Sequence, residues 1–528
     1  MKKAASSTPE VITRFAPSPT GYIHIGNIRT AIYAYLIAKQ AEGKFILRIE
    51  DTDRARYVEG ATEMVEDALR WLGLDWNEGY DAALNFPPYA DADHTTTTTS
   101  KHTDTNPTTA DVTKHTPAHD LGSDGPYVQS ERKEIYHEWA RKLIKQGRAY
   151  ADPTPQELID QYRQDDNAKK IPYLYRNHRP EHTPDWHEGL PLRFKSDPKP
   201  YQWCDEVMGD ISTGPEVCDD IILIKKDGLP TYNFAHIVDD ATMHVTHVVR
   251  GVEYLSSMPN YLALYEALHL DRPKFLCLPN ILAPGSNKKL GKRDGAKSAV
   301  EYRTDGILPE ALLNYLACLG WNDGTEQEIY SKEELIKNFR IDHIQNSGAH
   351  FDETKILWMN GQWIRRLVTE QGIAEFYPRT LEYWPAVAAT EPDEKKQAVL
   401  AIIYDRLKVL SDLRTMTEYF FVDPEINLPE LTGNKFLKKL SESELITLLT
   451  TVISTLTDLS DWNEVTLQDT LNQLLVDTGK KPAELFSLIR ISVSFAPFSP
   501  ALHLTLNVLG REATLARLNA VRTALSQG

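Results

Sequence analysis

The first fifty positions combine short apolar runs with one longer stretch of helical spacing. Residues 11–15 form a strand-like run that ends in a turn rich in proline and glycine at 17–21. Apolar residues then recur at intervals of three and four from Ile28 to Ala38, which predicts a helix, and residues 45–49 predict the next strand. Strand, long helix and strand are typical of the opening of a parallel α/β sheet.

The same two periodicities continue along the chain. They predict helices at 59–72, 131–146 and 258–268, and strands at 221–224 and 244–249. We interpret the strand at 221–224 as the point where the sheet resumes after an inserted domain. Beyond about Phe351 the pattern becomes helical throughout, most clearly in the apolar stripe at 445–459, which we interpret as the packed core of a helical region.

Residues 81–124 interrupt both patterns. The segment is rich in Thr, Asp, Pro and His and has few apolar residues to bury, so we expect a solvated, flexible insertion. It contains four histidines whose spacings match no standard metal-ligand motif, and we predict no metal site there. These histidines are His94, His102, His115 and His119.

Composition narrows the class of protein. A chain of 528 residues with 41% hydrophobic and 25% charged residues is expected to fold into two to four globular units. Its net charge of −17 argues against binding a polyanion over the whole surface and leaves a local basic face as the route to nucleic acid. The four cysteines form no C-x-x-C pair, and no apolar stretch predicts a signal peptide or membrane span. We therefore expect a cytoplasmic protein with no membrane association.

Three segments carry candidate chemistry. Residues 14–27 combine a strand end, a stiff turn and a helix entry, whose unpaired N–H groups suit a phosphate. Residues 288–293 place several cations on a glycine-containing loop that could close over a triphosphate. Glu50, Tyr232 and Arg250 lie at or just beyond predicted strand ends, where open α/β sheets bind ligands. Taken singly, each segment is better explained as a structural turn, a solvated loop or surface ion pairs.

Taken together, these segments resemble the glutamyl-tRNA synthetases of the bacterial type, which are class I aminoacyl-tRNA synthetases. Residues 14–27 are similar to the first signature of that class and residues 289–293 to the second. The resemblance covers nearly the whole chain outside the Thr-rich insertion. Further matching segments are 48–53, 127–130, 232–235, 238–240, 246–251, 308–321, 351–352 and 509–512.

The resemblance implies a fold and its division into domains. We expect an α/β Rossmann-like catalytic domain with an inserted acceptor-end domain, followed by an all-α anticodon-binding region. The first half of the catalytic domain would span 1–125 and include the insertion at about 81–124. The acceptor-end domain would span 126–220, the second catalytic half with a stem-contact region 221–350, and the anticodon-binding region 351–528.

The resemblance also implies an activity. Such enzymes use ATP with Mg²⁺ to form glutamyl-adenylate from L-glutamate, and then transfer the glutamyl group to the 3′-terminal adenosine of tRNA-Glu. Positioning and electrostatics would supply much of the catalysis, so no conventional nucleophilic side chain is needed. We expect a monomer. Charging of tRNA-Gln in addition to tRNA-Glu stays open as an alternative.

Residue by residue, the resemblance assigns the site. His24 and Lys292 match catalytic positions. Arg14 matches the arginine that pairs with the glutamate side-chain carboxylate, a bidentate contact that lysine would make poorly. Glu50 matches the group that faces the α-ammonium. The other expected glutamate-binding residues are Ala16, Ser18, Tyr232 and Arg250, and the expected ATP-binding residues are His24, Gly26, Glu253, Lys289, Lys292 and Arg293.

The chain departs from the family pattern at three places. Gly291 stands where the second signature usually has serine, so one hydroxyl contact is missing, and Val252 replaces a usual carboxylate beside Glu253. Both changes could slow the activation of ATP. Some bacterial members bind zinc through a Cys-x-Cys, but the matching segment here, residues 149–152, contains no cysteine, and we predict no structural zinc.

Four other identities share part of this pattern. Glutaminyl-tRNA synthetases usually read Pro-Glu-Pro-Asn-Gly at the turn that here spans 17–21. A short paralogue that glutamylates a modified tRNA base would lack the helical region after Phe351, and a small-molecule nucleotidyltransferase would not need so long a helical part. A non-catalytic tRNA-binding relative is disfavoured by the intact signature residues, and Gly291 is the one hint in its favour.

Overall fold

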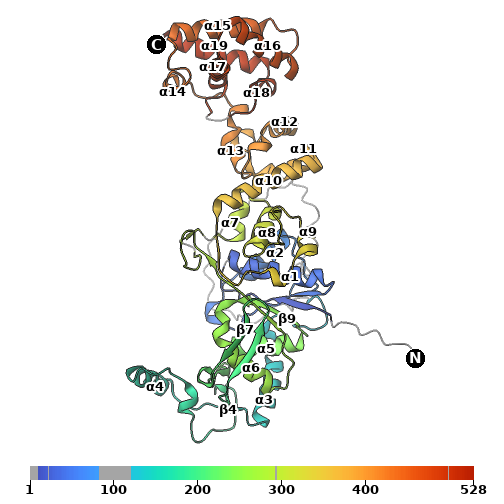
Figure 1. The fold of residues 1–528 in the computed structure, drawn as a ribbon, viewed down its shortest axis with the longest axis vertical. Helices are drawn as coiled ribbons and strands as arrows, with labels where there is room; N and C mark the ends of the chain where they lie inside the picture. Colours follow the sequence, from blue (N-terminus) through green and yellow to red (C-terminus); the bar gives the residue numbers. More distant parts are fainter. Residues whose placement is uncertain are drawn as a thin grey trace, which may run out of the picture. The chain divides into compact units, whose positions relative to one another are not determined.

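A computed structural model shows how the chain is organised (Figure 1). It describes residues 10–21, 23–81, 120–291, 294–295, 297–496 and 499–527. Two compact units are present: one holds residues up to 300 together with 313–352, and the other holds 301–312 and 353–528. Nearly all of the predicted Thr-rich insertion, its four histidines included, lies outside the described residues, as do Lys292 and Arg293.

A seven-stranded sheet forms the centre of the first unit, in the order β3-β2-β1-β9-β10-β6-β7. Neighbouring strands are parallel except β6 and β7, which form an antiparallel hairpin at one edge. The next strand in sequence, β2, pairs on one side of β1 and β9 pairs on the other, so the strand order reverses at β1, where ligand crevices form in such sheets. The strands are β1 (Ile12–Phe15), β2 (Lys44–Leu47), β3 (Glu78–Gly79), β6 (Tyr201–Asp205), β7 (Gly209–Thr213), β9 (His247–Gly251) and β10 (Lys274–Leu278).

Helices cover the sheet. In Figure 1, α1 (Ile25–Gln40) lies to one side of β9, and α5 (Tyr232–Thr242) and α6 (Met258–Ala267) lie to the other. Eleven of the sixteen residues of α1 are buried, which explains why its sequence is apolar around much of its circumference. The helices predicted at 28–38, 59–72, 131–146 and 258–268 are confirmed. The other helices that begin before residue 353 are α2 (Ala61–Trp71), α3 (Lys133–Lys145), α4 (Gln156–Ala168), α7 (Ala299–Thr304), α8 (Pro309–Cys318) and α9 (Lys332–Asn338).

The strand at 221–224 is present but belongs to another sheet. It forms β8 (Ile222–Ile224), which pairs antiparallel with β5 (Leu192–Phe194) in a three-stranded sheet completed by β4 (Ala149–Ala151). The prediction that this strand resumes the main sheet is therefore wrong. The main sheet is instead extended by β6 and β7, which come from within the predicted insert. An apolar run identifies a strand but not its partner, because partner choice depends on contacts far away in sequence.

The strand predicted from His244 begins later, at His247. His244 has φ +56° and lies in the turn that closes α5, where the Val245 N–H donates to the Asp240 carbonyl at 2.8 Å. The helix end and its turn occupy these positions, so the extended conformation starts three residues further on.

The second unit is helical throughout its described part. The stripe predicted at 445–459 forms α15, whose N-terminus is closed by a capping box between Ser441 and Glu444. Leu445, Leu449 and Val452 on this helix are fully buried in a core shared with α16, α17, α18 and α19. The helices are α10 (Glu353–Gln371), α11 (Ile373–Phe376), α12 (Asp393–Ile403), α13 (Asp412–Met416), α14 (Leu428–Gly433), α15 (Glu442–Thr457), α16 (Glu464–Thr478), α17 (Pro482–Ser494), α18 (Leu502–Leu509) and α19 (Arg511–Gln527).

The expected α/β region with a following helical region is thus confirmed. Two short strands, β11 (Ile281–Leu282) and β12 (Ala349–His350), pair in parallel at the end of the first unit. None of the helices in the described part of the chain is both long and apolar enough to span a bilayer.

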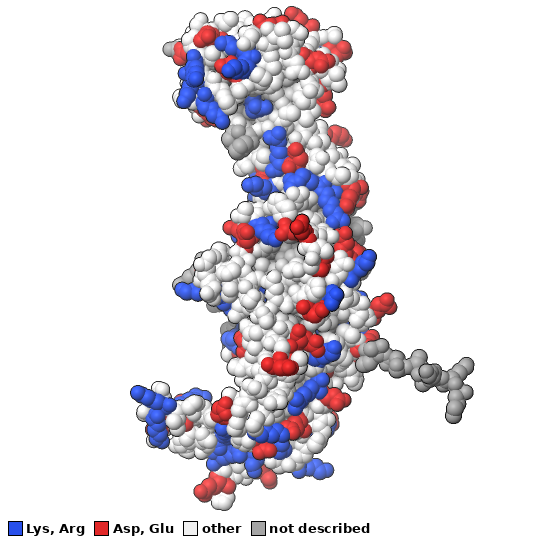
Figure 2. Space-filling model, in the orientation of Figure 1, with Lys and Arg blue, Asp and Glu red and all other residues white. Residues whose placement is uncertain are grey.

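Charged side chains are mixed over most of the face shown in Figure 2, but lysine and arginine gather in places. One group lies over α3, β4 and α4, where Arg141, Lys145 and Lys169 are exposed. Another lies beside α14, where the exposed Lys438 and Lys439 follow the helix. The local basic faces that an acidic chain needs for nucleic acid are therefore present.

Candidate active site

A cavity of about 460 Å³ lies beyond the carboxyl ends of β1, β2, β9 and β10. Every predicted site residue in the described part of the chain lines it, although these residues are up to 275 positions apart. They are Arg14, Ala16, Ser18, His24, Gly26, Glu50, Tyr232, Arg250, Glu253 and Lys289. The fold therefore brings the three candidate segments to one place, while the role of each residue stays a prediction.

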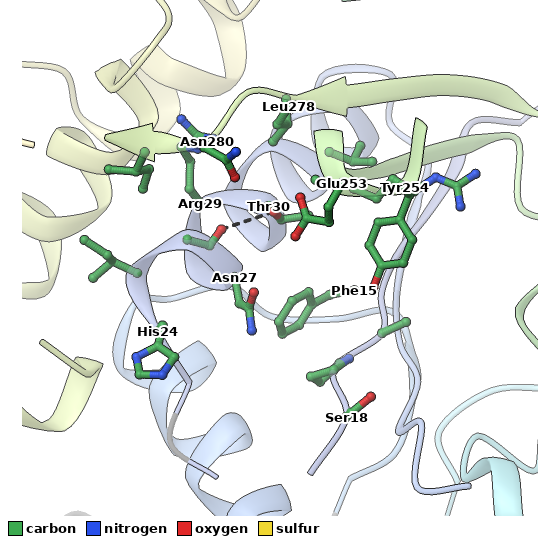
Figure 3. A pocket seen from close by; sticks show the side chains of 18 of the residues that line it. Phe15, Ser18, His24, Asn27, Arg29, Thr30, Glu253, Tyr254, Leu278 and Asn280 are labelled. Atoms are coloured by element: carbon green, nitrogen blue, oxygen red, sulfur yellow. Dashed lines mark hydrogen bonds between the residues drawn. The ribbon is translucent and has the colours of Figure 1, made fainter. Parts of the chain in front are cut away.

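The first turn of α1 forms one wall of the cavity (Figure 3). His24 is the N-cap residue, and its carbonyl accepts from the N–H groups of Asn27 at 2.9 Å and Ile28 at 3.1 Å. A Cβ at Gly26 would meet no atom within 4 Å, so the glycine leaves open space beside the backbone. A helix N-terminus with such access is suited to a phosphate or a ribose.

The loop that carries the second candidate segment closes another side. Leu290 N–H donates to the Ile281 carbonyl at 2.8 Å, and Lys289 Nζ lies 3.2 Å from Glu253 Oε1. At Gly291 the backbone N–H donates to Asp294 Oδ2 at 3.2 Å. The Asp294 carboxylate therefore holds the backbone of this loop at Gly291.

Behind the cavity the acidic and basic side chains form a buried network. Asp240 accepts from Arg14 Nε at 3.0 Å and from Arg48 Nη1 at 2.8 Å, both on its Oδ1. Arg48 also donates from Nη2 to Glu50 Oε1 at 3.1 Å. Asp239 is completely buried in the same network, 3.6 Å from Arg48 Nε. These contacts fix the Glu50 carboxylate at the wall of the cavity.

Burial makes the charge of Glu50 sensitive to its surroundings. Loss of water around this carboxyl group raises its pKa to about 7, and the positive charges of Arg48 and Arg14 oppose that rise. Asp240 shows the opposite balance, because Arg14 and Arg48 hold its pKa well below the usual range despite burial. Whether Glu50 is ionised near neutral pH therefore depends on each donor that stabilises its carboxylate.

Arg250 is buried without an acidic partner among the described residues. Its guanidinium lies 5.1 Å from the ring centre of Tyr261 and 5.6 Å from that of Tyr254, and Nη2 approaches the Met258 sulfur at 3.2 Å. Its Nε and Nη1 have no hydrogen-bond partner there. Unpaired donors on a buried cation cost free energy, so an anion that accepts hydrogen bonds from Arg250 would be bound favourably.

The charges around the cavity do not balance. Five buried arginines lie at the cavity or in the network behind it, against three buried carboxylates, so positive charge is in excess there even when Glu50 is ionised. A ligand that brings a carboxylate to Arg250 and an ammonium group to Glu50 would give each of these side chains an oppositely charged partner. The arginines are Arg14, Arg29, Arg48, Arg132 and Arg250, and the carboxylates are Glu50, Asp239 and Asp240.

Several residues that line the cavity have no role assigned from the sequence, among them Arg29, Asn280 and Tyr254. Arg29 on α1 is 5% exposed and donates to the Leu319 and Pro279 carbonyls. Asn280 follows β10 and projects toward the cavity in Figure 3, near Arg29. Tyr254 stacks near Tyr232, with ring centres 5.3 Å apart. Two features of the sequence could have identified the first two: Arg29 interrupts the apolar repeat of α1, and Asn280 is a polar residue just after a buried strand.

The segment at 149–152, where zinc was predicted to be absent, carries an ionic cluster. Asp152 accepts from Arg193 Nε at 2.6 Å and from the Tyr175 hydroxyl at 2.6 Å, and it is 1% exposed. Within the described ranges no group of three or more His, Cys, Asp or Glu side chains is placed to hold a metal ion. The absence of zinc stays a prediction.

Comparison with known proteins relates this geometry to a family. Residues 10–358 match the family model of the catalytic domain of class I tRNA synthetases (E and Q), and residues 375–522 match an anticodon-binding domain. A glutamate–tRNA ligase of Clostridium botulinum is 38% identical over 97% of this chain and 98% of its own, and one of Dehalococcoides mccartyi is 35% identical over 98% and 99%. A crystal structure of a glutamate–tRNA ligase from Elizabethkingia meningosepticum in complex with its amino acid matches 98% of this chain and all of its own, with TM-score 0.79 and 30% identity.

Proposed function

The chain belongs to the glutamate–tRNA ligases, within the class I tRNA synthetases, and on this basis we propose that it charges tRNA-Glu with L-glutamate through a glutamyl-adenylate. The observation that carries the proposal is that Arg250 and Glu50, both buried, line the same cavity. A buried guanidinium with unpaired donors and a buried carboxylate in one cavity suit an amino acid that has a second carboxylate.

The hydrogen-bond partners of Arg14 and Arg250 favour different roles for these two arginines of the cavity. Arg14 already donates to Asp240 and to the Val249 carbonyl at 3.2 Å, whereas Nε and Nη1 of Arg250 have no partner among the described residues. We therefore assign the glutamate side-chain carboxylate first to Arg250, with Arg14 beside it. Glu50 would take the α-ammonium, and Tyr232, Ala16 and Ser18 would complete the pocket.

The first step joins the amino acid to ATP. An oxygen of the glutamate α-carboxylate attacks the α-phosphorus, the bond from that phosphorus to the β-phosphate oxygen breaks, and pyrophosphate leaves. The first turn of α1, with His24 and Gly26, would bind the phosphates and stabilise the added negative charge. Lys289, Lys292 and Arg293 would compensate the pyrophosphate, and Mg²⁺ would enter as part of the ATP complex.

The second step transfers the glutamyl group to tRNA. A ribose hydroxyl of the terminal adenosine attacks the activated carbonyl, the bond to the phosphate oxygen breaks, AMP leaves, and the hydroxyl proton is released. Neither step needs a nucleophilic side chain, so positioning and charge carry the catalysis. Glu253 would contact the ATP ribose, and the anticodon-binding domain at 375–522 would select the tRNA. We propose that the protein works as a cytoplasmic monomer.

The direct test is aminoacylation with labelled glutamate and ATP on tRNA-Glu, on tRNA-Gln and without tRNA. We expect charging of tRNA-Glu, and at least a hundredfold loss in an Arg250→Met variant that removes the unpaired cation. Charging of tRNA-Gln at a comparable rate would extend the function to both tRNAs. No charging of either tRNA by a protein that still binds them would refute the catalytic proposal.

A further inference from the structure

Gln129 is a buried residue in contact with the site that the reaction outlined above does not use. It begins a short 3₁₀ turn, Gln129–Arg132, and none of its surface is exposed. Its Nε2 donates to Asp239 Oδ2 at 2.8 Å and lies 3.3 Å from Glu50 Oε1. One amide group thus bridges the carboxylate at the cavity wall and the carboxylate behind it.

The orientation of this amide follows from its neighbours. Ionised carboxylate oxygens only accept hydrogen bonds, so the nitrogen of the amide must face both of them. As a result the amide oxygen is buried with no partner among the described residues. A glutamine that served only to fill space would not leave its acceptor unpaired.

The backbone around Gln129 is tied to the same elements. The Gln129 N–H donates to the Ile49 carbonyl at 3.0 Å, and the Ser130 N–H donates to Asp51 Oδ1 at 2.8 Å. On the other side, Arg132 Nε donates to Asp239 Oδ1 at 2.8 Å and the Tyr136 hydroxyl donates to the same carboxylate at 2.9 Å. The amide is therefore held from both ends and has little freedom to turn.

We propose that Gln129 is a positioning residue for the amino-acid substrate, because its amide fixes Oε1 of Glu50 and so directs the other carboxylate oxygen to the ammonium group. Arg48 and Gln129 both donate to Oε1 of Glu50. No described residue donates to Oε2 of Glu50, and this side chain lines the cavity. This inference rests on the proposed function, in which Glu50 binds the α-ammonium of glutamate.

The same contact has a consequence for the pH dependence of substrate binding. Gln129 donates to the ionised form of a carboxyl group whose pKa burial raises to about 7, so removing the donor raises that pKa further. An acid whose pKa rises is neutral over a wider range, and binding of an ammonium group is then lost at a higher pH. At high pH the carboxyl group is ionised in either case, and the loss should be small.

The groups that face Glu50 come from several elements. Burial lowers the pKa of His236 to about 3 and raises the pKa of Tyr232, Tyr254 and Tyr261, so these four groups stay neutral near pH 7. The pKa of Glu50, raised by burial to about 7, lies within the range from pH 6 to 8.5. The set is Arg48 on its own strand end, Arg14 on β1, Gln129 on the 3₁₀ turn, Tyr232, His236, Asp239 and Asp240 on α5, Arg250 on β9, Tyr254 after it, and Tyr261 on α6.

The test uses the full chain and follows kcat/KM for glutamate in aminoacylation of tRNA-Glu from pH 6 to 8.5. Gln129→Met keeps the size of the side chain and removes both donors, and Gln129→Glu also adds a negative charge between two carboxylates. Gln146→Met, on the exposed residue that directly follows α3, is the matched control. Glu50→Gln tests the proposed function separately.

We expect the acid limb of the Gln129→Met profile to move up by about one pH unit, and further in Gln129→Glu. At pH 6.5 this gives about a tenfold loss of kcat/KM for glutamate through KM, with less than about a twofold loss at pH 8.5. Equal loss of kcat at every pH, with an unmoved limb, would show a merely structural role and overturn the proposal. If Glu50→Gln leaves the KM for glutamate unchanged, it is the assignment of Glu50 that fails.

Discussion

Arg14 and Arg250 show how two arginines on adjacent parallel strands differ through their partners alone. Each is 4% exposed, and each lines the same cavity. Asp240 neutralises Arg14, whereas Arg250 is surrounded by aromatic rings and a methionine sulfur. Aromatic faces attract a cation but leave its N–H groups without acceptors, so the substrate gains most by pairing with Arg250.

At the residue scale, this difference predicts unequal effects of one substitution. Arg250→Lys keeps the charge but loses the planar pair of donors, and we expect the KM for glutamate to rise by about tenfold to a hundredfold. Arg14→Lys should raise it less, because Asp240 still compensates the charge. Steady-state aminoacylation with varied glutamate measures both. A larger effect at Arg14 would mean that the side-chain carboxylate of glutamate binds Arg14 rather than Arg250.

Gly291 allows a second prediction at this scale. Its φ is not in the left-handed region, and an added Cβ would meet Asp294 Oδ2 at 3.3 Å, an atom at the end of a side chain that can move. Gly291→Ser supplies the missing hydroxyl near the phosphates, and we expect kcat to rise about two- to tenfold with the KM for glutamate unchanged. Gly291→Ala is the control that adds the Cβ without the hydroxyl. An equal gain from alanine would mean that loop stiffness, rather than a new contact, is responsible.

At the scale of elements, the network behind the site joins pieces that the sequence separates. Asp239 and Asp240 on α5, Arg48 after β2 and Arg132 on the 3₁₀ turn come from three stretches of the chain. Removing one member would leave an unpaired charge in the interior, which costs far more than the pair itself contributes. The elements around the cavity are therefore fixed relative to one another by charge as well as by apolar packing.

Helix α15 illustrates the other kind of stabilisation, by apolar burial. Leu449 is completely buried in the core of the helical unit, whereas Val476 on α16 is 74% exposed. Leu449→Ala should destabilise this unit by about 2–5 kcal/mol through the lost burial and the cavity left behind. Val476→Ala, the control, should change it by less than about 0.5 kcal/mol. Hydrogen exchange of peptides from 442–527 measures both, and equal protection in the two variants would contradict the assignment of this core.

At the scale of the whole molecule, the negative net charge opposes binding of the proposed tRNA, which is also negatively charged. A chain with net charge −17 repels RNA at long range, so binding depends on places where lysine and arginine gather. The group beside α14 lies within the domain that matches anticodon-binding proteins. Because the chain as a whole is acidic, a few lysines there should carry much of the attraction.

The double variant Lys438→Glu, Lys439→Glu tests this dependence. We expect at least a tenfold loss of tRNA affinity and a smaller slope of log Kd against log salt concentration, because fewer counterions are released. Kinetic constants for glutamate at saturating tRNA should be unchanged, since the site lies in the other unit. Lys337→Glu, an exposed lysine on α9, is the control. A wild-type slope in the double variant would place the tRNA contact elsewhere.

The sequence by itself determined the elements and the candidate residues of this protein. Helices α1 and α15 follow from the spacing of apolar residues, and strand β1 follows from a short apolar run, because both patterns reflect local burial. The predicted site residues that lie in the described part of the chain all line one cavity, since strand ends in a parallel sheet converge whatever lies between them.

The tertiary structure decided what those elements and residues pair with. The partner of β8, the extension of the main sheet by β6 and β7, and the positive φ of His244 depend on contacts that no local period encodes. The same is true of the site: Asp240 pairs with a residue 226 positions away, and Gln129 contacts Glu50 across 79. Charge and hydrogen-bond partners are chosen by proximity in the folded chain, and so the unpaired state of Arg250 became visible only there.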